Sequence, residues 1–320
     1  MPKVSVIMLS YNYERYIGEA IESVLVQTFS DFELLIIDDF SRDKSAEIIR
    51  RYAQTDARIK CLFHTSNKGI AKSLNEGLFL CKGEYIAYIS SDDVWEDDRL
   101  QAGVGVLDST PNVGILYSDL MVIDENSNPT GQLISSLYRS RTGRYSGNLF
   151  DTLLRGNFIC VSSILMCRRD VEGLRFNEKL RYLNDWLYLL EVSEKNSFYY
   201  VSCPLARYRV HPRSTNLDVA AYASDYVTLV AIILEKFLER VRRDRKLLAR
   251  HYFVIGYLLC SAGELKQGRK YLTRSVKMAP LNIKATSLAL ISLLGRGTFN
   301  IAVKSYRDIR DWRLRGQREK

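Results

Sequence analysis

The sequence predicts an α/β fold with a mostly parallel sheet, followed by an all-helical C-terminal region. Apolar, strand-like runs alternate with helix-like segments up to about residue 120. Two acidic pairs, Asp38-Asp39 and Asp92-Asp93, come directly after two of these runs. From about residue 220 onward only helical periodicity remains. Strands that alternate with helices form parallel sheets through right-handed crossovers, which is why we expect this fold.

The first strand is expected at residues 4–9, a continuous apolar run typical of a strand that is buried on both faces. A helix should follow at 18–27, where Ala20, Ile21, Val24 and Leu25 recur at helical spacing. The same alternation predicts strands at 34–37, 59–63, 85–90 and 114–117, and helices at 45–52, 70–80 and 97–108.

Beyond about residue 120 the alternation weakens. Residues 124–129 have the composition of a turn, and 131–147 is rich in Ser, Arg and Gly, which predicts a mobile loop near a ligand. A strand around 160–166, a helix from about Asn184 and strands within 198–209 are expected to follow.

Residues 216–320 are expected to form a basic helical appendage. Within it, residues 251–280 place large, small and proline residues as one tetratricopeptide repeat does. The matching positions are Tyr252, Ile255, Gly256, Leu259, Gly268, Leu272, Ser275 and Pro280. A stable solenoid usually needs about three repeats. The segment is therefore either one tetratricopeptide-like hairpin or an ordinary helical hairpin packed on the preceding domain.

The composition indicates a globular protein, with 47% hydrophobic and 26% charged residues. No run of about eighteen uncharged apolar residues occurs, which argues against a membrane-spanning helix. Residues 1–4 lead directly into the first strand and leave no room for a signal peptide. The six cysteines show neither a CxxC pair nor zinc-site spacing, so we expect reduced thiols in a cytoplasmic protein.

The net charge of +9 is distributed unevenly. Residues 221–320 carry 21 Lys and Arg against 8 Asp and Glu, whereas the first 220 residues have a net charge of −4. By charge alone, the basic region fits nucleic acid, anionic lipid or an anionic glycan. An apolar patch at 288–294 stands near basic residues, namely Lys304, Arg307, Arg310, Arg313 and Arg315. This pattern suggests peripheral contact with the inner face of a membrane.

The two acidic pairs end the apolar runs 34–37 and 85–89. Carboxylates just past the carboxyl ends of parallel strands lie where open α/β sheets bind ligands. Mg²⁺ and Mn²⁺ favour oxygen ligands and bridge phosphates. One such pair alone is more simply a solvated turn, but two pairs in one series predict a polar ligand together with a divalent cation.

Seven motifs occur in order within residues 3–215. They are Val4–Asn12 (VSVIMLSYN), Glu33–Ser41 (ELLIIDDFS), Asn67–Gly69 (NKG), Asn75–Gly77 (NEG), Gly83–Trp95 (GEYIAYISSDDVW), Asn184–Trp186 (NDW) and Tyr208–His211 (YRVH). No single motif is specific, but in this order and spacing they resemble the family-2 inverting glycosyltransferases of GT-A fold. The resemblance implies a Rossmann-like GT-A domain over residues 1–215, a nucleotide-sugar donor that is UDP-linked, and a cofactor that is Mn²⁺ or Mg²⁺.

The resemblance also assigns roles in the acidic motif and at the donor base. Asp93 is implied as the metal ligand, and Asp92 as a partner of the ribose or the metal. Ser91 stands where the family commonly has an aspartate. Asp39 matches the carboxylate that accepts from the base, typically from the N3–H of uracil. A carboxylate there would reject cytosine, because the N3 of cytosine is itself an acceptor.

The remaining donor-binding positions follow from the same resemblance. Leu9, Ser10 and Tyr11 match the residues that wrap the base, and Tyr11 either stacks on it or is an ordinary loop tyrosine. Asn67 and Asn75 match positions near the diphosphate. Leu74 replaces an arginine that often precedes the second Asn, which leaves Lys72 as the nearest cation for the phosphates, or else as a solvated helix residue.

An inverting transfer needs a base that removes the proton of the acceptor hydroxyl. The resemblance identifies Asp185 as this base, although by residue type alone Asn184 and Asp185 are good helix caps. In related enzymes a histidine at the position of His211 reaches the metal or the diphosphate, and an imidazole ligand favours Mn²⁺. Arg209 or Arg213 are further candidates for phosphate contact.

We therefore expect metal-dependent transfer of a sugar from a UDP-sugar to a glycan or lipid-linked acceptor, in surface polysaccharide assembly, with no nucleic-acid partner. One alternative is a nucleotidyltransferase, but Ser10–Gly18 lacks the Gly-rich, basic phosphate loop that this class needs. The other is a degenerate sugar-nucleotide-binding scaffold. The intact set of Asp39, Asp92, Asp93 and Asp185 argues against such decay.

Overall fold

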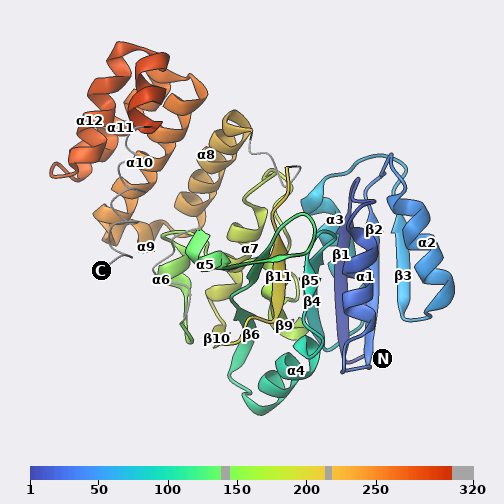
Figure 1. Ribbon diagram of the computed structural model, residues 1–320. Coiled ribbons are helices and arrows are strands. Elements are labelled where there is room, and N and C mark those ends of the chain that lie inside the picture. Colours follow the sequence, from blue (N-terminus) through green and yellow to red (C-terminus); the bar gives the residue numbers. More distant parts are fainter. Residues whose placement is uncertain (138–144, 213–217, 305–320) are drawn as a thin grey trace. The chain divides into compact units, whose positions relative to one another are not determined.

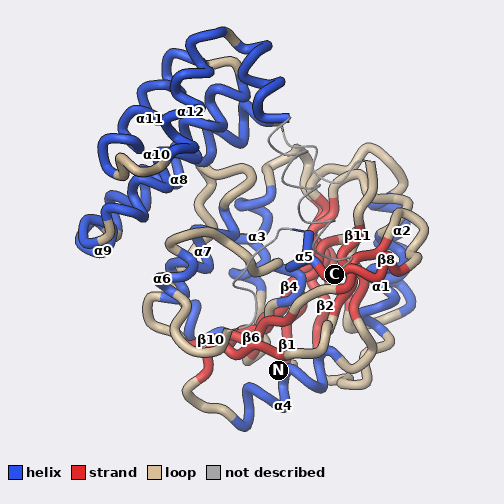
Figure 2. The backbone as a smooth tube through the Cα atoms, turned by 60° about the vertical axis from the view of Figure 1, so that its left-hand side comes forward, coloured by secondary structure: helices blue, strands red, loops and turns tan. Residues whose placement is uncertain are grey.

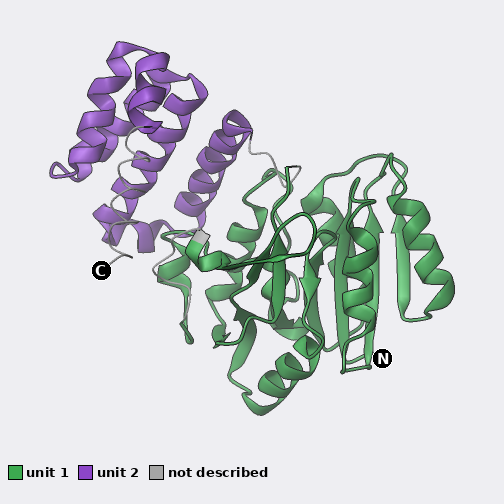
Figure 3. Cartoon of the chain, in the orientation of Figure 1, with its two compact units in different colours: residues 1–216 green, residues 217–320 purple. Residues whose placement is uncertain are grey.

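The computed structural model describes residues 1–137, 145–212 and 218–304. The chain divides into two compact units, residues 1–216 and 217–320 (Figure 3). The first unit is α/β with a mostly parallel sheet, and the second is helical (Figures 1 and 2). The predicted fold class is confirmed. The predicted boundary at residues 215–216 and the basic residues Arg307, Arg310, Arg313 and Arg315 lie outside the described residues.

The main sheet has seven strands in the order β10-β6-β9-β4-β1-β2-β3. In chain order these are β1 (Val4–Ser10), β2 (Phe32–Asp38), β3 (Ile59–Phe63), β4 (Tyr85–Ser90), β6 (Val113–Ser118), β9 (Leu165–Cys167) and β10 (Ser197–Val201). Only β9 runs antiparallel to its neighbours among these strands of the described sheet. Central β1 pairs with both β2 and β4, which explains its continuous apolar run.

The pairing register brings the strand ends together. Ser10 at the end of β1 lies opposite Asp38 at the end of β2, and Leu9 lies opposite Ser90 at the end of β4. The residues that follow these three strands therefore emerge at one edge of the sheet, where an open α/β sheet binds its ligand.

The helices of the first unit are α1 (Ile17–Leu25), α2 (Ser45–Thr55), α3 (Ile70–Leu80), α4 (Arg99–Ser109), α5 (Ile134–Leu137), α6 (Phe150–Leu153) and α7 (Asn184–Ser193). Helix α1 buries Ala20, Ile21 and Val24, as its apolar spacing predicts. These side chains join the core that packs against β1, β2 and β4.

A second sheet has the order β5-β11-β7-β8, with β5 (Val94–Trp95), β7 (Met121–Ile123), β8 (Pro129–Leu133) and β11 (Ala206–Arg209). The loop predicted over 131–147 is wrong in its first part, where strand β8 and helix α5 occur. Strand β8 is an exposed edge strand, so its sequence has no apolar face from which a strand could be predicted. Residues 138–144 lie outside the described part of the chain.

The strand predicted at 160–166 is also partly wrong. Val161–Ser163 is a 3₁₀ turn, η1, and strand β9 begins only at Leu165. Both the backbone N–H and the hydroxyl of Ser163 donate to the carbonyl of Cys160. A serine that bonds to nearby backbone in this way favours a turn over a strand ladder.

The second unit contains α8 (Val219–Lys236), α9 (Leu238–Arg243), α10 (Arg245–Ala262), α11 (Leu265–Met278), α12 (Ile283–Ile291) and the 3₁₀ turn η3 (Ser292–Leu294). Helices α10 and α11 form a hairpin. A Cβ on Gly256 would lie 2.8 Å from the Gly268 carbonyl oxygen, so the two backbones touch. A tetratricopeptide-like role for this hairpin stays a prediction. Within the described ranges, no helix combines the length and apolarity that crossing a bilayer requires.

Candidate active site

The loops after β1 and β2 are tied to one another by polar side chains. Asp38 accepts from the backbone N–H of Ser41 (3.0 Å) and from the hydroxyl of Ser10 (3.1 Å). The side-chain oxygen of Asn12 accepts from the N–H of Arg42 (2.7 Å). Phe40, between these contacts, has a positive φ of 69° and lies 3.8 Å below the Arg42 guanidinium. Asp38 thus holds the loop after β2 in place.

Asp39 is buried and receives three donors at its carboxylate. Its Oδ1 accepts from the N–H of Lys68 (2.7 Å) and lies 2.8 Å from His64 Nδ1, and its Oδ2 accepts from the N–H of Gly69 (2.8 Å). The side chain of Asn67 donates to the Asp39 carbonyl (3.3 Å). The structure therefore brings together Asp39 and Asn67, two predicted site residues from separate motifs.

The three residues predicted to wrap the base lie at the end of β1. The carbonyl of Leu9 accepts from the hydroxyl of Ser91 (2.7 Å), and the Ser10 hydroxyl is turned to Asp38. Tyr11 is 46% exposed, so its ring is open to a ligand. Ser91 therefore links the ends of β1 and β4, in place of the charge that an aspartate would add.

Asp92 and Asp93 differ in their contacts. Asp93 is buried; its Oδ2 accepts from the Ser162 hydroxyl (2.6 Å) and its Oδ1 from the N–H of Arg209 (3.1 Å). The Oδ2 of Asp92 lies 3.2 Å from His211 Nε2. Burial, and then the neighbouring charge of Asp92, raises the pKa of Asp93 to about 8. Burial also raises the pKa of Asp92, against the effect of His211.

Ser162 is held by two donors. The indole N–H of Trp95 (3.2 Å) and the guanidinium of buried Arg99 (3.0 Å) both donate to the Ser162 carbonyl. The Ser162 hydroxyl in turn accepts from the N–H of Ser90 (3.1 Å) while it donates to Asp93. The 3₁₀ turn η1, which contains Ser162, therefore holds the Asp93 carboxylate in place.

Arg209 is the last residue of β11, and His211 follows two residues later. The Arg209 guanidinium is buried and donates to the Asp92 carbonyl (2.8 Å), to Glu19 (2.6 Å) and to Ser127 (2.8 Å). Arg209 therefore supports the acidic motif, and Arg213 lies outside the described residues. The His211 ring packs 4.8 Å from the Tyr16 ring, centre to centre.

Asp185 lies in the first turn of α7. Its Oδ1 accepts from the N–H of Trp186 (2.7 Å) and its Oδ2 from Asn157 Nδ2 (3.1 Å). Desolvation raises the pKa of Asp185 to about 6, although both hydrogen bonds oppose it. The N-cap residue of α7 is Leu183, so Asp185 is not at the N-cap position, although its carboxylate accepts from the first-turn N–H of Trp186.

The Cys160 thiol senses three of the aspartates. Burial raises the pKa of this thiol, and the charges of Asp93, Asp185 and Asp92 raise it further. These three carboxylates therefore lie within electrostatic range of one thiol. No group of three or more His, Cys, Asp and Glu side chains is arranged as a metal site in the part of the chain that the structure describes.

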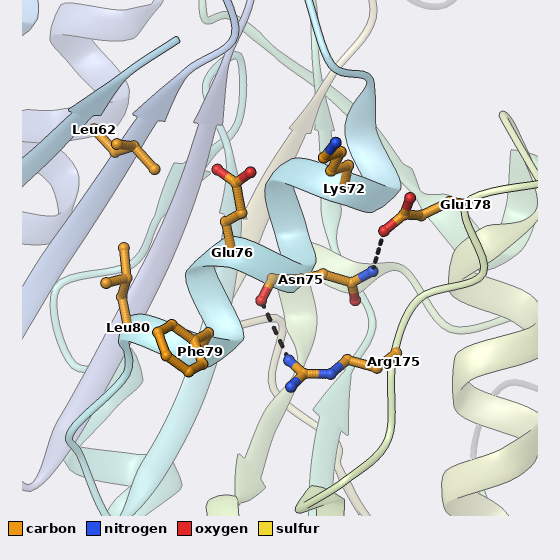
Figure 4. A pocket seen from close by; sticks show the side chains of 8 residues that line it. All are labelled: Leu62, Lys72, Asn75, Glu76, Phe79, Leu80, Arg175 and Glu178. Carbon is orange, nitrogen blue, oxygen red and sulfur yellow. Dashed lines mark hydrogen bonds between the residues drawn. The ribbon is translucent and has the colours of Figure 1, made fainter.

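Asn75 and Lys72 lie elsewhere, in a pocket of about 360 Å³ along α3 (Figure 4). The pocket is lined by Leu62, Lys72, Asn75, Glu76, Phe79, Leu80, Arg175 and Glu178. Asn75 exchanges hydrogen bonds with the backbone of Phe176 (2.8 and 3.0 Å). Asp39, Asp92, Asp93 and Asp185 do not line this pocket. A donor-binding role for Asn75 and Lys72 stays a prediction.

Three polar residues of the site were missed from the sequence: His64, Asn157 and Ser162. His64 carried a usable signal, because it is one of three histidines and comes shortly before the NKG motif. Asn157 and Ser162 lie in a segment without a recognisable motif, and only the folded chain brings them to Asp185 and Asp93.

Comparison with known proteins agrees with this geometry. The family model "Glycosyl transferase family 2" matches residues 5–174. An uncharacterized glycosyltransferase of Nostoc sp. is 32% identical over 70% of this chain and 69% of its own length. Another, of Rickettsia typhi, is 30% identical over 75% of this chain and 74% of its own length.

Solved structures share the fold at low identity. S. aureus TarS 1–349 in complex with UDP-GlcNAc has a TM-score of 0.66 and 18% identity, over 96% of this chain and 92% of that one. The mannosyltransferase PcManGT from Pyrobaculum calidifontis, in complex with GDP-Man and Mn²⁺, has a TM-score of 0.59 and 17% identity, over 96% and 88%. The family model over residues 5–174 and the relatives of 32% and 30% identity show that the chain belongs to glycosyl transferase family 2 and is a glycosyltransferase.

Proposed function

We propose that this enzyme transfers a sugar, with inversion and with the help of a divalent cation, from a UDP-sugar to a glycan or lipid-linked acceptor. The observation that carries the proposal is the position of the acidic residues at one edge of the sheet, where the ends of β2 and β4 lie on either side of β1, with Asp39 after β2 and Asp92 and Asp93 after β4. A nucleotide bound along this edge would have its base at β2 and its diphosphate at β4.

Base recognition is assigned to Asp39. A carboxylate oxygen has about two lone-pair positions, and Oδ1 of Asp39 already uses both, for Lys68 and His64. Oδ2 uses one, for Gly69, and keeps one position open. An N–H of the donor base fits this position. The N3–H of uracil suits it, whereas the N3 of cytosine is an acceptor and does not.

The cation is assigned to Asp92 and His211. Mg²⁺ and Mn²⁺ sites commonly combine one or two carboxylates with substrate phosphates, so the absence of a larger ligand cluster among the described residues fits a cation shared with the donor. When bound, such a cation neutralises the departing diphosphate. The sequence assigned Asp93 instead. Asp93 is only 1% exposed, whereas the Asp92 side chain is 14% exposed and lies beside His211, which favours Asp92 as the direct ligand.

The base is assigned to Asp185. As a carboxylate it accepts the proton of the acceptor hydroxyl while that oxygen attacks C1 of the sugar from the face opposite the diphosphate. Asn157 and the N–H of Trp186 hold the carboxylate and favour its charged form. Attack from the opposite face gives a β-linkage from an α-linked donor.

A thermal-shift screen of sugar nucleotides, with and without Mn²⁺, tests the donor proposal. A ligand that binds only the folded protein raises the melting temperature with its occupancy. UDP-sugars should raise it most, and more with Mn²⁺ than without. A larger shift with CDP- or GDP-linked sugars, or none with any sugar nucleotide, would contradict the proposal.

The second unit is proposed to contact an anionic membrane near a lipid-linked acceptor, as a surface polysaccharide enzyme would require. Residues 265–304 contain eight Lys and Arg and no Asp or Glu. On α11, Lys266, Lys270, Arg274 and Lys277 recur at helical spacing and are exposed. Large apolar side chains are exposed nearby in sequence, namely Leu281, Ile283, Leu290, Leu293 and Leu294. Exposed apolar residues beside basic ones suit an anionic bilayer surface.

A further inference from the structure

His64 is enclosed between two carboxylates. Its Nδ1 lies 2.8 Å from Asp39 Oδ1, and its Nε2 lies 2.7 Å from Glu76 Oε2. Its side chain is only 1% exposed. Glu76 also accepts from Lys68 Nζ (2.8 Å), so a chain of polar contacts runs from Asp39 through His64 and Glu76 to Lys68.

The contacts of this chain set the role of the His64 ring. Lys68, and then His64, lowers the pKa of Glu76, which keeps Glu76 an acceptor. On its other side the ring places Nδ1 against Asp39 Oδ1, where a ring N–H donates to the carboxylate and fixes its orientation.

This contact matters for base recognition because a protonated Asp39 would behave differently. A carboxylate only accepts, so it pairs with the N3–H of uracil. A carboxylic acid also donates, and it could therefore pair with the N3 acceptor of cytosine. A group that donates to Asp39 and fixes its orientation consequently favours its role as an acceptor, and with it the pyrimidine that is bound.

We propose that His64 is a positioning residue for base selection, which holds Asp39 as an acceptor and is itself held by Glu76 and Lys68. The proposal rests on the role of Asp39 proposed above. It predicts that the N–H donor at Nδ1 of His64, and not the volume of the ring, controls the preference for UDP over CDP.

Two amide variants separate these properties. The amide nitrogen of His64→Asn falls near the position of Nδ1 and can still donate to Asp39. The amide of His64→Gln falls near Nε2 and can reach Glu76 but not Asp39. We expect His64→Gln to weaken UDP binding about tenfold and to lower the UDP-to-CDP preference, since a hydrogen bond to a charged group is lost. His64→Asn should stay within about threefold of the parent, since that bond is kept.

The measurement is calorimetric titration of UDP and of CDP in saturating Mn²⁺, with melting temperatures for each variant. Glu76→Gln is a second test variant. Glu76 is partly exposed, and this substitution leaves the His64 ring in place. We expect it to weaken UDP binding about threefold, less than His64→Gln, because it removes only the outer carboxylate. Equal affinities for the Asn and Gln variants, or losses that follow only the melting temperatures, would overturn the proposal.

Asp39→Asn separates this proposal from the one on which it rests. If Asp39→Asn and His64→Gln both lose UDP affinity and UDP-to-CDP preference, both proposals are supported. If only Asp39→Asn does so, the role of His64 is refuted and the role of Asp39 stands. If Asp39→Asn binds UDP as the parent does, Asp39 is not the base acceptor and both proposals fall.

Discussion

The two acidic pairs lie at the carboxyl ends of β2 and β4 but differ in what surrounds them. At the end of β2, backbone N–H groups of Ser41, Lys68 and Gly69 donate to Asp38 and Asp39. Past β4, burial raises the pKa of both Asp92 and Asp93. The carboxylates of Asp38 and Asp39 thus already accept hydrogen bonds from backbone N–H groups. The charged forms of Asp92 and Asp93, by contrast, would be stabilised most by added positive charge. A site of the second kind suits a cation, because ligands must lose their protons to bind it.

The largest expected effect lies outside both pairs, at Asp185. Asp185→Asn removes the base and should reduce transfer by about 10²–10⁴-fold, the usual contribution of a general base. Affinity for UDP with Mn²⁺ should remain within about twofold, because the base acts on the acceptor. Initial rates and calorimetric titration measure the two quantities. If donor affinity falls in parallel with the rate, Asp185 is structural.

A matched pair of variants tests the β4 end of the comparison. Asp92→Asn should abolish the effect of Mn²⁺ on UDP affinity, whereas Asp93→Asn should reduce it about tenfold, as loss of a supporting residue behind a metal ligand does. Titration of UDP over a range of Mn²⁺ concentrations measures both. Complete loss in Asp93→Asn with a mild effect in Asp92→Asn would restore the assignment made from the sequence.

The pH dependence tests whether Asp185 is as desolvated as its surroundings imply. Its pKa of about 6 lies above the ordinary value, and the carboxylate is the active form. The value of kcat/KM should therefore be constant above this pKa and fall about tenfold per pH unit below it. Asn157→Ala removes a hydrogen bond that lowers this pKa, so the acidic limb should move to higher pH.

Lys72→Ala is the control for this pH profile, because Lys72 lies in the α3 pocket, which none of the four aspartates lines. It should leave the acidic limb where it is, whatever it does to KM. A limb that stays unchanged in Asn157→Ala would assign the titration to another group.

The last prediction concerns the membrane and leaves the reaction itself unaffected. Replacing Lys266, Lys270 and Lys277 by Gln should weaken binding to anionic vesicles by about 1 kcal/mol for each lysine, at low salt. UDP affinity should not change. The matched control replaces three exposed lysines of the first unit, Lys44, Lys82 and Lys179. Equal losses for the two triple variants, or no vesicle binding by the parent even at low salt, would refute the proposal.

Much of the first unit could be predicted because its signals are local. Buried parallel strands such as β1 and β2 are continuous apolar runs, and the aspartates follow them directly. Edge strand β8 and the turn at Ser162 carry no such signal. The contacts of Asn157 with Asp185 and of His64 with Asp39 join residues 28 and 25 positions apart, which no sequence period connects.

The positive φ of Phe40 has an evolutionary consequence. A side chain in the left-handed region costs about 1–2 kcal/mol, a cost that glycine does not carry. No glycine codon can be reached from a phenylalanine codon by a single base change. One of the two intermediates encodes valine, whose branched Cβ makes this backbone conformation worse. Even without any use for the ring, this turn would therefore change slowly along the path through valine, because that path begins with a less suitable residue.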